Sequence, residues 1–87
     1  MRYDDIDQAF SPIRENITTK QLHMSGDFNN NSKIYFSVND GPRLYAETDI
    51  GGFFEYDFDA LKIGDVVNFY IKDKSNYTVF FTEKIRE

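Results

Sequence analysis

Acidic and aromatic residues alternate along residues 54–59, which read Phe-Glu-Tyr-Asp-Phe-Asp. In an extended strand the three acids of this segment share one face, about 6.6–6.8 Å apart. This spacing is close to the separation of successive phosphates on a nucleic-acid strand. Two further acids precede the segment, so the candidate acidic surface consists of Glu47, Asp49, Glu55, Asp57 and Asp59. The pattern predicts a surface that binds a basic protein in place of nucleic acid, or alternatively the solvated face of a half-buried strand.

Three tyrosines form a second candidate binding set. Tyr35, Tyr45 and Tyr70 each fall on the outward side of a predicted strand, because the positions next to them are apolar. Tyr45 is predicted to oppose Ser37, which leaves Tyr35 diagonal to it and within reach of a ring contact. If Tyr70 lies on a neighbouring strand, the rings form a patch that stacks nucleobases or anchors a protein. The alternatives are that N-terminal helices cover the rings, or that the rings are separate surface residues.

The chain lacks the residues that most enzyme sites need. It has one histidine, His23, no cysteine, and no serine in a nucleophile-elbow motif. No acid stands next to His23 in the sequence to orient it as a general base. Carboxylates that alternate along a strand diverge from a common centre, which disfavours a calcium site. We therefore predict a protein that is not an enzyme and has no catalytic residues, metal site or cofactor.

Most of the chain after Lys20 has the two-residue period of β-strands. Apolar and polar residues alternate in the segments 22–28, 33–38, 43–50, 53–59, 66–71 and 77–82. Gly26 is predicted to bend or bulge the first strand, and turns are predicted at 40–42 and at 51–52. The pattern predicts an antiparallel sheet of five or six strands.

Residues 4–18 have the spacing of a helix instead. Their apolar positions follow one helical stripe, which is Ile6, Phe10, Ile13 and Ile17. Pro12 prevents one uninterrupted helix, and Ser11 suits an N-cap in front of it. We predict one short helix near 4–10 and another near 12–18. Both are expected to pack on the sheet, with binding of a partner by the stripe as the alternative.

Matching the apolar faces predicts the register of two hairpins. The predicted pairs are Val38 with Leu44, Phe36 with Ala46 and Lys33 with Asp49 in the middle hairpin, and Val67 with Phe81 and Phe69 with Val79 in the last. The last hairpin is expected to turn at residues 73–75.

The sequence Leu-Lys-Ile-Gly-Asp-Val-Val at 61–67 resembles the entry to a late strand in cold-shock and related RNA-binding domains of the OB-fold. Residues 79–85 resemble the last strand of those domains. The resemblance, which covers 61–71 and 79–85, implies a small antiparallel barrel, and SH3-like barrels enter a strand in the same way. Residues 33–38 carry neither the glycine pattern nor the basic residues of the family's RNA-binding strands, so the resemblance supports the fold and does not extend to RNA binding. The predicted fold class is mainly β: a five- to six-stranded antiparallel barrel or sandwich, OB-like or SH3-like, with a short N-terminal helical segment.

The 87 residues predict one domain, with a helical appendage at 1–18 and a β-barrel at 20–87. The lack of cysteine and an acidic N-terminus, where a signal peptide would be basic, predict a cytoplasmic protein. No apolar run approaches the roughly 18 residues of a membrane span. The net charge of −5 disfavours non-specific binding to nucleic acid.

Taken together, these patterns predict a non-catalytic protein-binding module. Its expected role is that of an acidic inhibitor or nucleic-acid mimic, and its expected partner is another protein with a basic, nucleic-acid-binding surface. One alternative is a single-stranded nucleic-acid-binding domain that uses Tyr35, Tyr45 and Tyr70. Another is a structural subunit of a homo-oligomer that buries its exposed aromatic residues. Direct binding of nucleic acid is the less favoured interpretation, and no membrane partner is expected.

Overall fold

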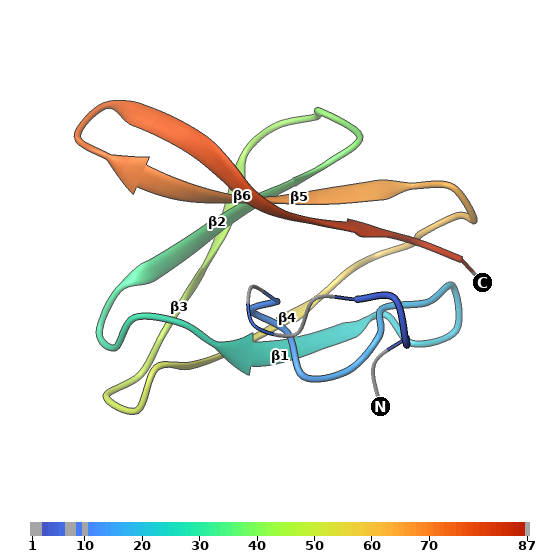
Figure 1. Ribbon diagram of the computed structural model, residues 1–87, viewed down its shortest axis with the longest axis horizontal. Helices are drawn as coiled ribbons and strands as arrows, with labels where there is room; N and C mark the ends of the chain where they lie inside the picture. The colour runs from blue at the N-terminus through green and yellow to red at the C-terminus, as the bar shows by residue number, and fades with distance from the viewer. Residues whose placement is uncertain (1–2, 7–8, 10, 87) are drawn as a thin grey trace.

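The computed structural model describes residues 3–6, 9 and 11–86, and these residues form six β-strands and no helix. The strands are β1 (His23–Asp27), β2 (Lys33–Val38), β3 (Leu44–Glu47), β4 (Phe53–Asp57), β5 (Val66–Asp73) and β6 (Asn76–Lys84). They pair antiparallel in two sheets, one of four strands in the order β3-β2-β5-β6 and one of β1 and β4 (Figure 1). The mainly β, antiparallel prediction is confirmed, but the described strands do not close into a barrel. These residues therefore include no helix that could span a membrane.

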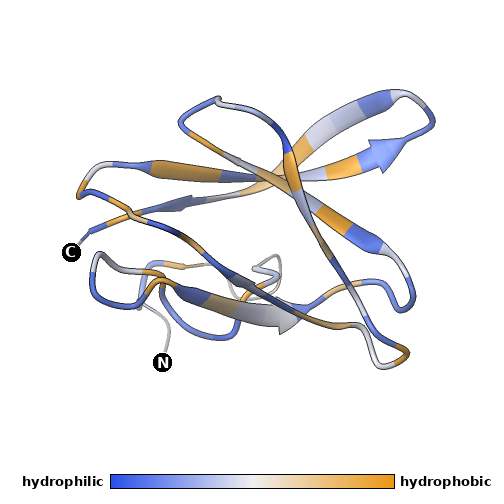
Figure 2. Ribbon diagram, turned by 180° about the vertical axis from the view of Figure 1, so that it is seen from behind, coloured by the Kyte–Doolittle hydropathy of each residue, from blue (hydrophilic) through white to orange (hydrophobic). Residues whose placement is uncertain are grey.

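The core lies between the two sheets and consists largely of the apolar residues that alternate along the strands (Figure 2). Phe36 of β2 is fully buried. Its ring centroid lies 4.8 Å from that of Tyr56 in β4 and 6.1 Å from that of Phe69 in β5. Aromatic ring pairs at such distances add about 0.5–1.5 kcal/mol to the burial of the rings. The aromatic residues therefore join the two sheets.

The helix predicted near 12–18 is wrong, because this segment runs beside β1 without helical structure. Ile13 forms an antiparallel bridge with Gly26, and the backbone N–H of Asp27 donates to the Pro12 carbonyl at 2.9 Å. Ile13 and Ile17 are both buried in the core. Side chains four residues apart share a face in an extended chain as well as in a helix. The apolar spacing therefore could not separate the two conformations.

The helix predicted near 4–10 falls partly outside the described residues, as does its apolar residue Phe10. Of the rest, residues 3–6 make a turn in which the Ile6 N–H donates to the Tyr3 carbonyl at 3.2 Å. The described N-terminal residues thus contain a turn where the prediction placed a helix.

The outward and inward faces of β2 and β3 are as predicted, but the register differs by two residues. The observed pairs are Lys33 with Glu47, Ile34 with Ala46, Tyr35 with Tyr45 and Phe36 with Leu44, in place of Val38–Leu44, Phe36–Ala46 and Lys33–Asp49. A shift of two residues leaves every side chain on its face, so the alternation of apolar residues cannot detect it. The turn between the strands is wider than predicted, and Asn39 and Asp40 adopt positive φ angles of 52° and 59° there.

The predicted register of the last hairpin is also wrong, because its turn spans two residues, 74–75, in place of 73–75, and because β6 contains a bulge. Phe69 pairs with Phe81 and Tyr70 with Val79, so Phe80 is an extra residue. Val67 accordingly lies opposite Glu83, and Val79 is 47% exposed although we predicted it to face the core. The extra residue reverses the alternation of the strand beyond it.

Candidate binding surface

Three tyrosines lie in a row across the outer face of the four-stranded sheet. Tyr35 of β2 pairs with Tyr45 of β3 on one side and with Tyr70 of β5 on the other. The ring centroids of Tyr35 and Tyr45 are 6.1 Å apart. The structure thus brings the three predicted tyrosines together, with Tyr45 directly opposite Tyr35 and not opposite Ser37 as predicted.

A fourth tyrosine, Tyr77 of β6, belongs to the same row, and sequence reasoning misses it. Its ring meets the ring of Tyr35 edge to face, with centroids 5.1 Å apart. Tyr77 pairs with Lys72 because a tight turn, in which Lys74 has a φ of 58°, joins β5 to β6. A two-residue turn at 74–75 places Tyr77 on the same face as Tyr70. Prediction of this turn, in place of a turn at 73–75, would have identified Tyr77.

Basic side chains lie against these rings. The guanidinium of Arg43 is 3.6 Å from the ring centroid of Tyr77 and 5.5 Å from that of Tyr70. The Lys72 ammonium lies 5.9 Å from the Tyr35 ring and 5.8 Å from the Tyr77 ring. A cation within about 6 Å of a ring centroid is attracted by the ring's electrons. These contacts hold the cations beside the rings on one surface.

The aromatic and basic residues together define a surface that we call the tyrosine face. It consists of Tyr35, Tyr45, Tyr70, Tyr77, Lys33, Arg43 and Lys72. The Lys33 ammonium lies 4.6 Å from the ring centroid of Tyr45, a residue that is 49% exposed. Lys33 also pairs with Glu47 across β2 and β3. The tyrosine face therefore carries three cations on a chain whose net charge is −5.

Hydrogen bonds on the tyrosine face and at its edge hold its residues in place. Ser37 is 1% exposed, and its hydroxyl bonds the Tyr70 hydroxyl at 2.8 Å. Asn39 donates to the Asp65 carboxylate at 2.9 Å and accepts from the Val66 N–H at 2.9 Å. The Asn39 bond lowers the pKa of Asp65, so this carboxylate is held in its charged form. These bonds fix the start of β5 against the end of β2.

The five candidate acids do not form one surface. Glu55 and Asp57 lie exposed on β4 in the two-stranded sheet, and Asp59 is exposed just beyond it. Glu47 belongs to β3 in the other sheet. The Asp49 carboxylate accepts hydrogen bonds from the backbone N–H groups of residues 51 and 53, at 2.9 and 3.0 Å, and so closes the turn before β4.

His23 has an acidic partner that its sequence neighbours do not indicate. It lies opposite Asp57 in the β1–β4 pair, and its Nδ1 is 2.6 Å from an oxygen of that carboxylate. Both side chains are exposed. Within the described part of the chain, no serine or threonine hydroxyl hydrogen-bonds His23. Nor do the described residues bring three or more metal-ligating side chains together.

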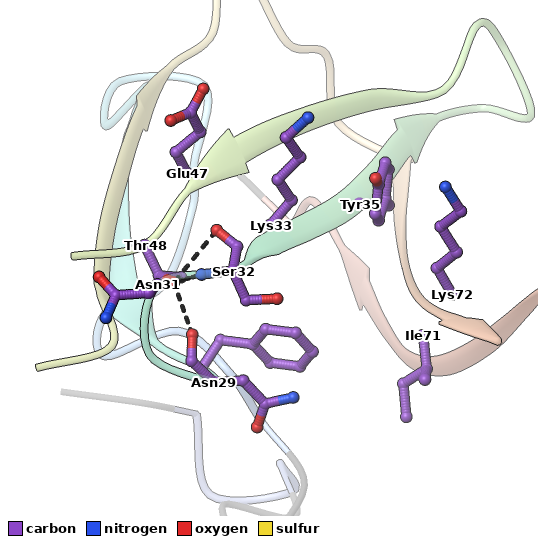
Figure 3. Close-up of a pocket in the computed structure, with 10 residues that line it drawn as sticks. Asn29, Asn31, Ser32, Lys33, Tyr35, Glu47, Thr48, Ile71 and Lys72 are labelled. Carbon is purple, nitrogen blue, oxygen red and sulfur yellow. Dashed lines mark hydrogen bonds between the residues drawn. The ribbon is translucent and has the colours of Figure 1, made fainter. Parts of the chain in front are cut away.

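A cleft of about 580 Å³ opens where β2 and β5 separate, at one end of the tyrosine face. The pairing of these strands ends at Tyr35 and Tyr70. The cleft is lined by Phe28, Asn29, Asn31, Ser32, Lys33, Tyr35, Glu47, Thr48, Ile71 and Lys72. Figure 3 shows Lys33, Tyr35 and Lys72 extending to the same side of the sheet, while Ile71 points to the other.

Comparison of the chain with protein-family models, curated proteins and solved structures finds no match.

Proposed function

We propose that this protein binds single-stranded nucleic acid on the tyrosine face. One observation carries the proposal: four tyrosines lie side by side across adjacent strands, with three cations against their rings. Surfaces that bind single strands combine aromatic rings, on which bases stack, with cations that neutralise phosphates. The tyrosine face offers both kinds of group on a single sheet.

Stacking is the interaction that this face supports best. Each base that stacks on an aromatic side chain contributes about 1–3 kcal/mol. Tyr45 is the most exposed of the four rings, and Tyr35 lies next to it. A base pair inside a duplex does not present its faces, so single strands are favoured over duplexes.

The overall negative charge does not conflict with this proposal. Phosphates are repelled by the acids of β4 and are attracted by the cations of the tyrosine face, which lie on the other sheet. The acids therefore restrict where a strand binds, and three cations limit the number of phosphate contacts. We expect modest affinity with a clear but shallow salt dependence.

A titration of fluorescein-labelled oligothymidylate of about eight nucleotides tests the proposal. We expect Tyr45→Ala to weaken binding about 5- to 100-fold, as the loss of one stacked base predicts. Tyr45→Phe keeps the ring and should bind like the wild type. Lys33→Gln should weaken binding and lower the slope of log K against log salt by about 1, whereas Lys20→Gln, outside the face, should leave the slope unchanged.

Two results would contradict the proposal. One is the absence of binding at low salt at protein concentrations approaching 1 mM. The other is equal loss of affinity in Tyr45→Ala and Tyr45→Phe, because that result would exclude stacking on the ring.

The acidic strand β4 supports a second candidate function, the binding of a basic protein. The observation in its favour is that Glu55, Asp57 and Asp59 are all exposed and follow one strand. It has less support because Glu47 and Asp49 lie elsewhere and Asp57 is paired with His23. Replacing Glu55, Asp57 and Asp59 by their amides should slow association with such a partner at low salt if this function holds.

A further inference from the structure

We infer that the cleft between residues 28–32 and the β5–β6 hairpin holds one nucleotide of a strand that lies on the tyrosine face. The inference rests on the proposed function and adds to it a defined pocket with its own contacts. The cleft adjoins the tyrosine face because Tyr35, Lys33 and Lys72 belong to both. A strand stacked on Tyr45 and Tyr35 therefore reaches the cleft at its next nucleotides.

Charge complementarity identifies a phosphate as the group that lies at the mouth of the cleft. Lys33 of β2 and Lys72 of β5 lie just beyond Tyr35 and Tyr70, the last pair of these two strands, at the point where the strands separate. Both lysines line the cleft. Their side chains extend to the same side (Figure 3). A phosphate between the two lysines contacts two cations. The lining also contains the carboxylate of Glu47, which lies opposite Lys33 in the β2–β3 pair.

The remaining walls suit a nucleobase. Ile71 is 47% exposed, and the ring of Phe28 stacks on that of Phe80 with centroids 5.7 Å apart. Asn29 and Asn31 line the cleft, and their side-chain amides make no hydrogen bond within the described part of the chain. An amide supplies both donors and an acceptor, which are the groups that recognise the edge of a base. A volume of about 580 Å³ lies within the range of small-ligand pockets.

The loop that carries these amides is fixed before any ligand binds. The Thr48 hydroxyl donates to the Asn29 carbonyl at 2.5 Å and accepts from the Ser32 N–H at 2.7 Å. The Asn31 N–H donates to the Asp49 carbonyl at 2.9 Å. Thr48 itself is buried. The backbone thus needs little ordering on binding, which favours affinity.

Two neighbouring asparagines allow a matched test in the oligothymidylate titration. Asn29 lines the cleft, whereas Asn30 is exposed in the same loop and does not. We expect Asn29→Ala to weaken binding about fivefold, as loss of one hydrogen bond predicts, and Asn30→Ala to have no effect. Lys72→Gln should weaken binding and reduce the salt slope, in contrast to Lys62→Gln. As a measurement on the unchanged protein, oligothymidylate should shift the backbone NMR signals of Asn29, Asn31 and Ser32.

The outcomes separate this inference from the proposed function. If Tyr45→Ala weakens binding but Asn29→Ala behaves like Asn30→Ala and the loop signals do not shift, the inference about the cleft is wrong and the proposed function stands. If the wild type does not bind oligothymidylate, both are wrong. Weaker binding by Asn29→Ala together with shifted loop signals supports both.

Discussion

At the scale of single residues, the pair of Ser37 and Tyr70 shows that the alternation of apolar and polar residues does not predict which outward side chains are buried. Both side chains point outward from the four-stranded sheet, as predicted, yet Ser37 is buried because its neighbours on this face are large. Its hydroxyl then needs a partner, and the Tyr70 hydroxyl supplies one at 2.8 Å. Tyr70 therefore contributes to the fold as well as to the tyrosine face.

This pair gives the first prediction. Tyr70→Phe should destabilise the protein by about 1–3 kcal/mol, because the buried Ser37 hydroxyl loses its partner. Tyr45→Phe, whose ring is half exposed, should change stability by less than about 0.5 kcal/mol. Adding Ser37→Ala to Tyr70→Phe should recover much of the loss, since both polar groups are then gone. Equal denaturation midpoints for the two single tyrosine variants would contradict this account.

A second prediction concerns Asp27, whose carboxylate accepts from the Arg14 guanidinium at 2.7 and 2.8 Å. This bond lowers the pKa of Asp27 below its usual value of 3.8. Because the folded state has the lower pKa, the stabilisation is complete above the unfolded pKa and is lost as the pH falls through the folded pKa. Asp27→Asn should therefore melt below the wild type at neutral pH, and the difference should shrink in acid below about pH 4.

Thermal melts at neutral and acidic pH test this prediction, with Asp59→Asn as the control. Asp59 is exposed and has no ion pair among the described residues, so its replacement removes a charge without removing a bond. A constant difference between Asp27→Asn and the wild type at every pH would show that the carboxylate's charge does not matter.

At the scale of elements, β1 depends on a close approach of the N-terminal segment. The sequence predicts a bend or bulge at Gly26, but β1 pairs regularly with β4 through this residue. The reason for glycine is different: a Cβ here would overlap the Pro12 carbonyl oxygen and lie 2.9 Å from the Ile13 Cα. The absence of a side chain lets residues 12–14 pack against the strand.

Gly26→Ala should consequently destabilise the protein by more than about 2 kcal/mol, since backbone atoms must move to admit the methyl group. Gly51→Ala is the matched control, because a Cβ there would make an ordinary contact at 3.5 Å with Asp49. Its stability should stay within about 0.5 kcal/mol of the wild type. Urea denaturation measures both, and a tolerated Gly26→Ala would refute the close packing.

The strands and most of their faces were predictable from the sequence, because the two-residue alternation indicates both at once, but Val79 of β6 was predicted to face the core and is exposed. The registers were not, since a shift of two residues preserves every face and the bulge at Phe80 has no signature in a run of apolar residues. For the candidate site, the alternation places Tyr35, Tyr45 and Tyr70 outward. The order of the strands, which sets these rings side by side and adds Tyr77, depends on long-range pairing that no local pattern contains.

At the scale of the whole molecule, the described residues form six β-strands and no helix. The far-ultraviolet circular dichroism spectrum should therefore lack the double minimum of helices. A helical content above about a tenth, well below the usual third of globular proteins, would contradict the observed course of residues 11–18. The same spectrum, recorded for each variant above, also shows whether its fold is intact.

The bulge in β6 has a consequence for behaviour at high concentration. β6 is the outermost strand of the larger sheet and, with nine residues, the longest. An unbroken edge of that length would offer a continuous row of unpaired backbone groups to another chain, which is how amyloid-like fibrils grow. The extra residue at Phe80 breaks the regular spacing of that row, and the opposite edge, β3, is only four residues long. Both ends of the sheet therefore resist edge-to-edge aggregation.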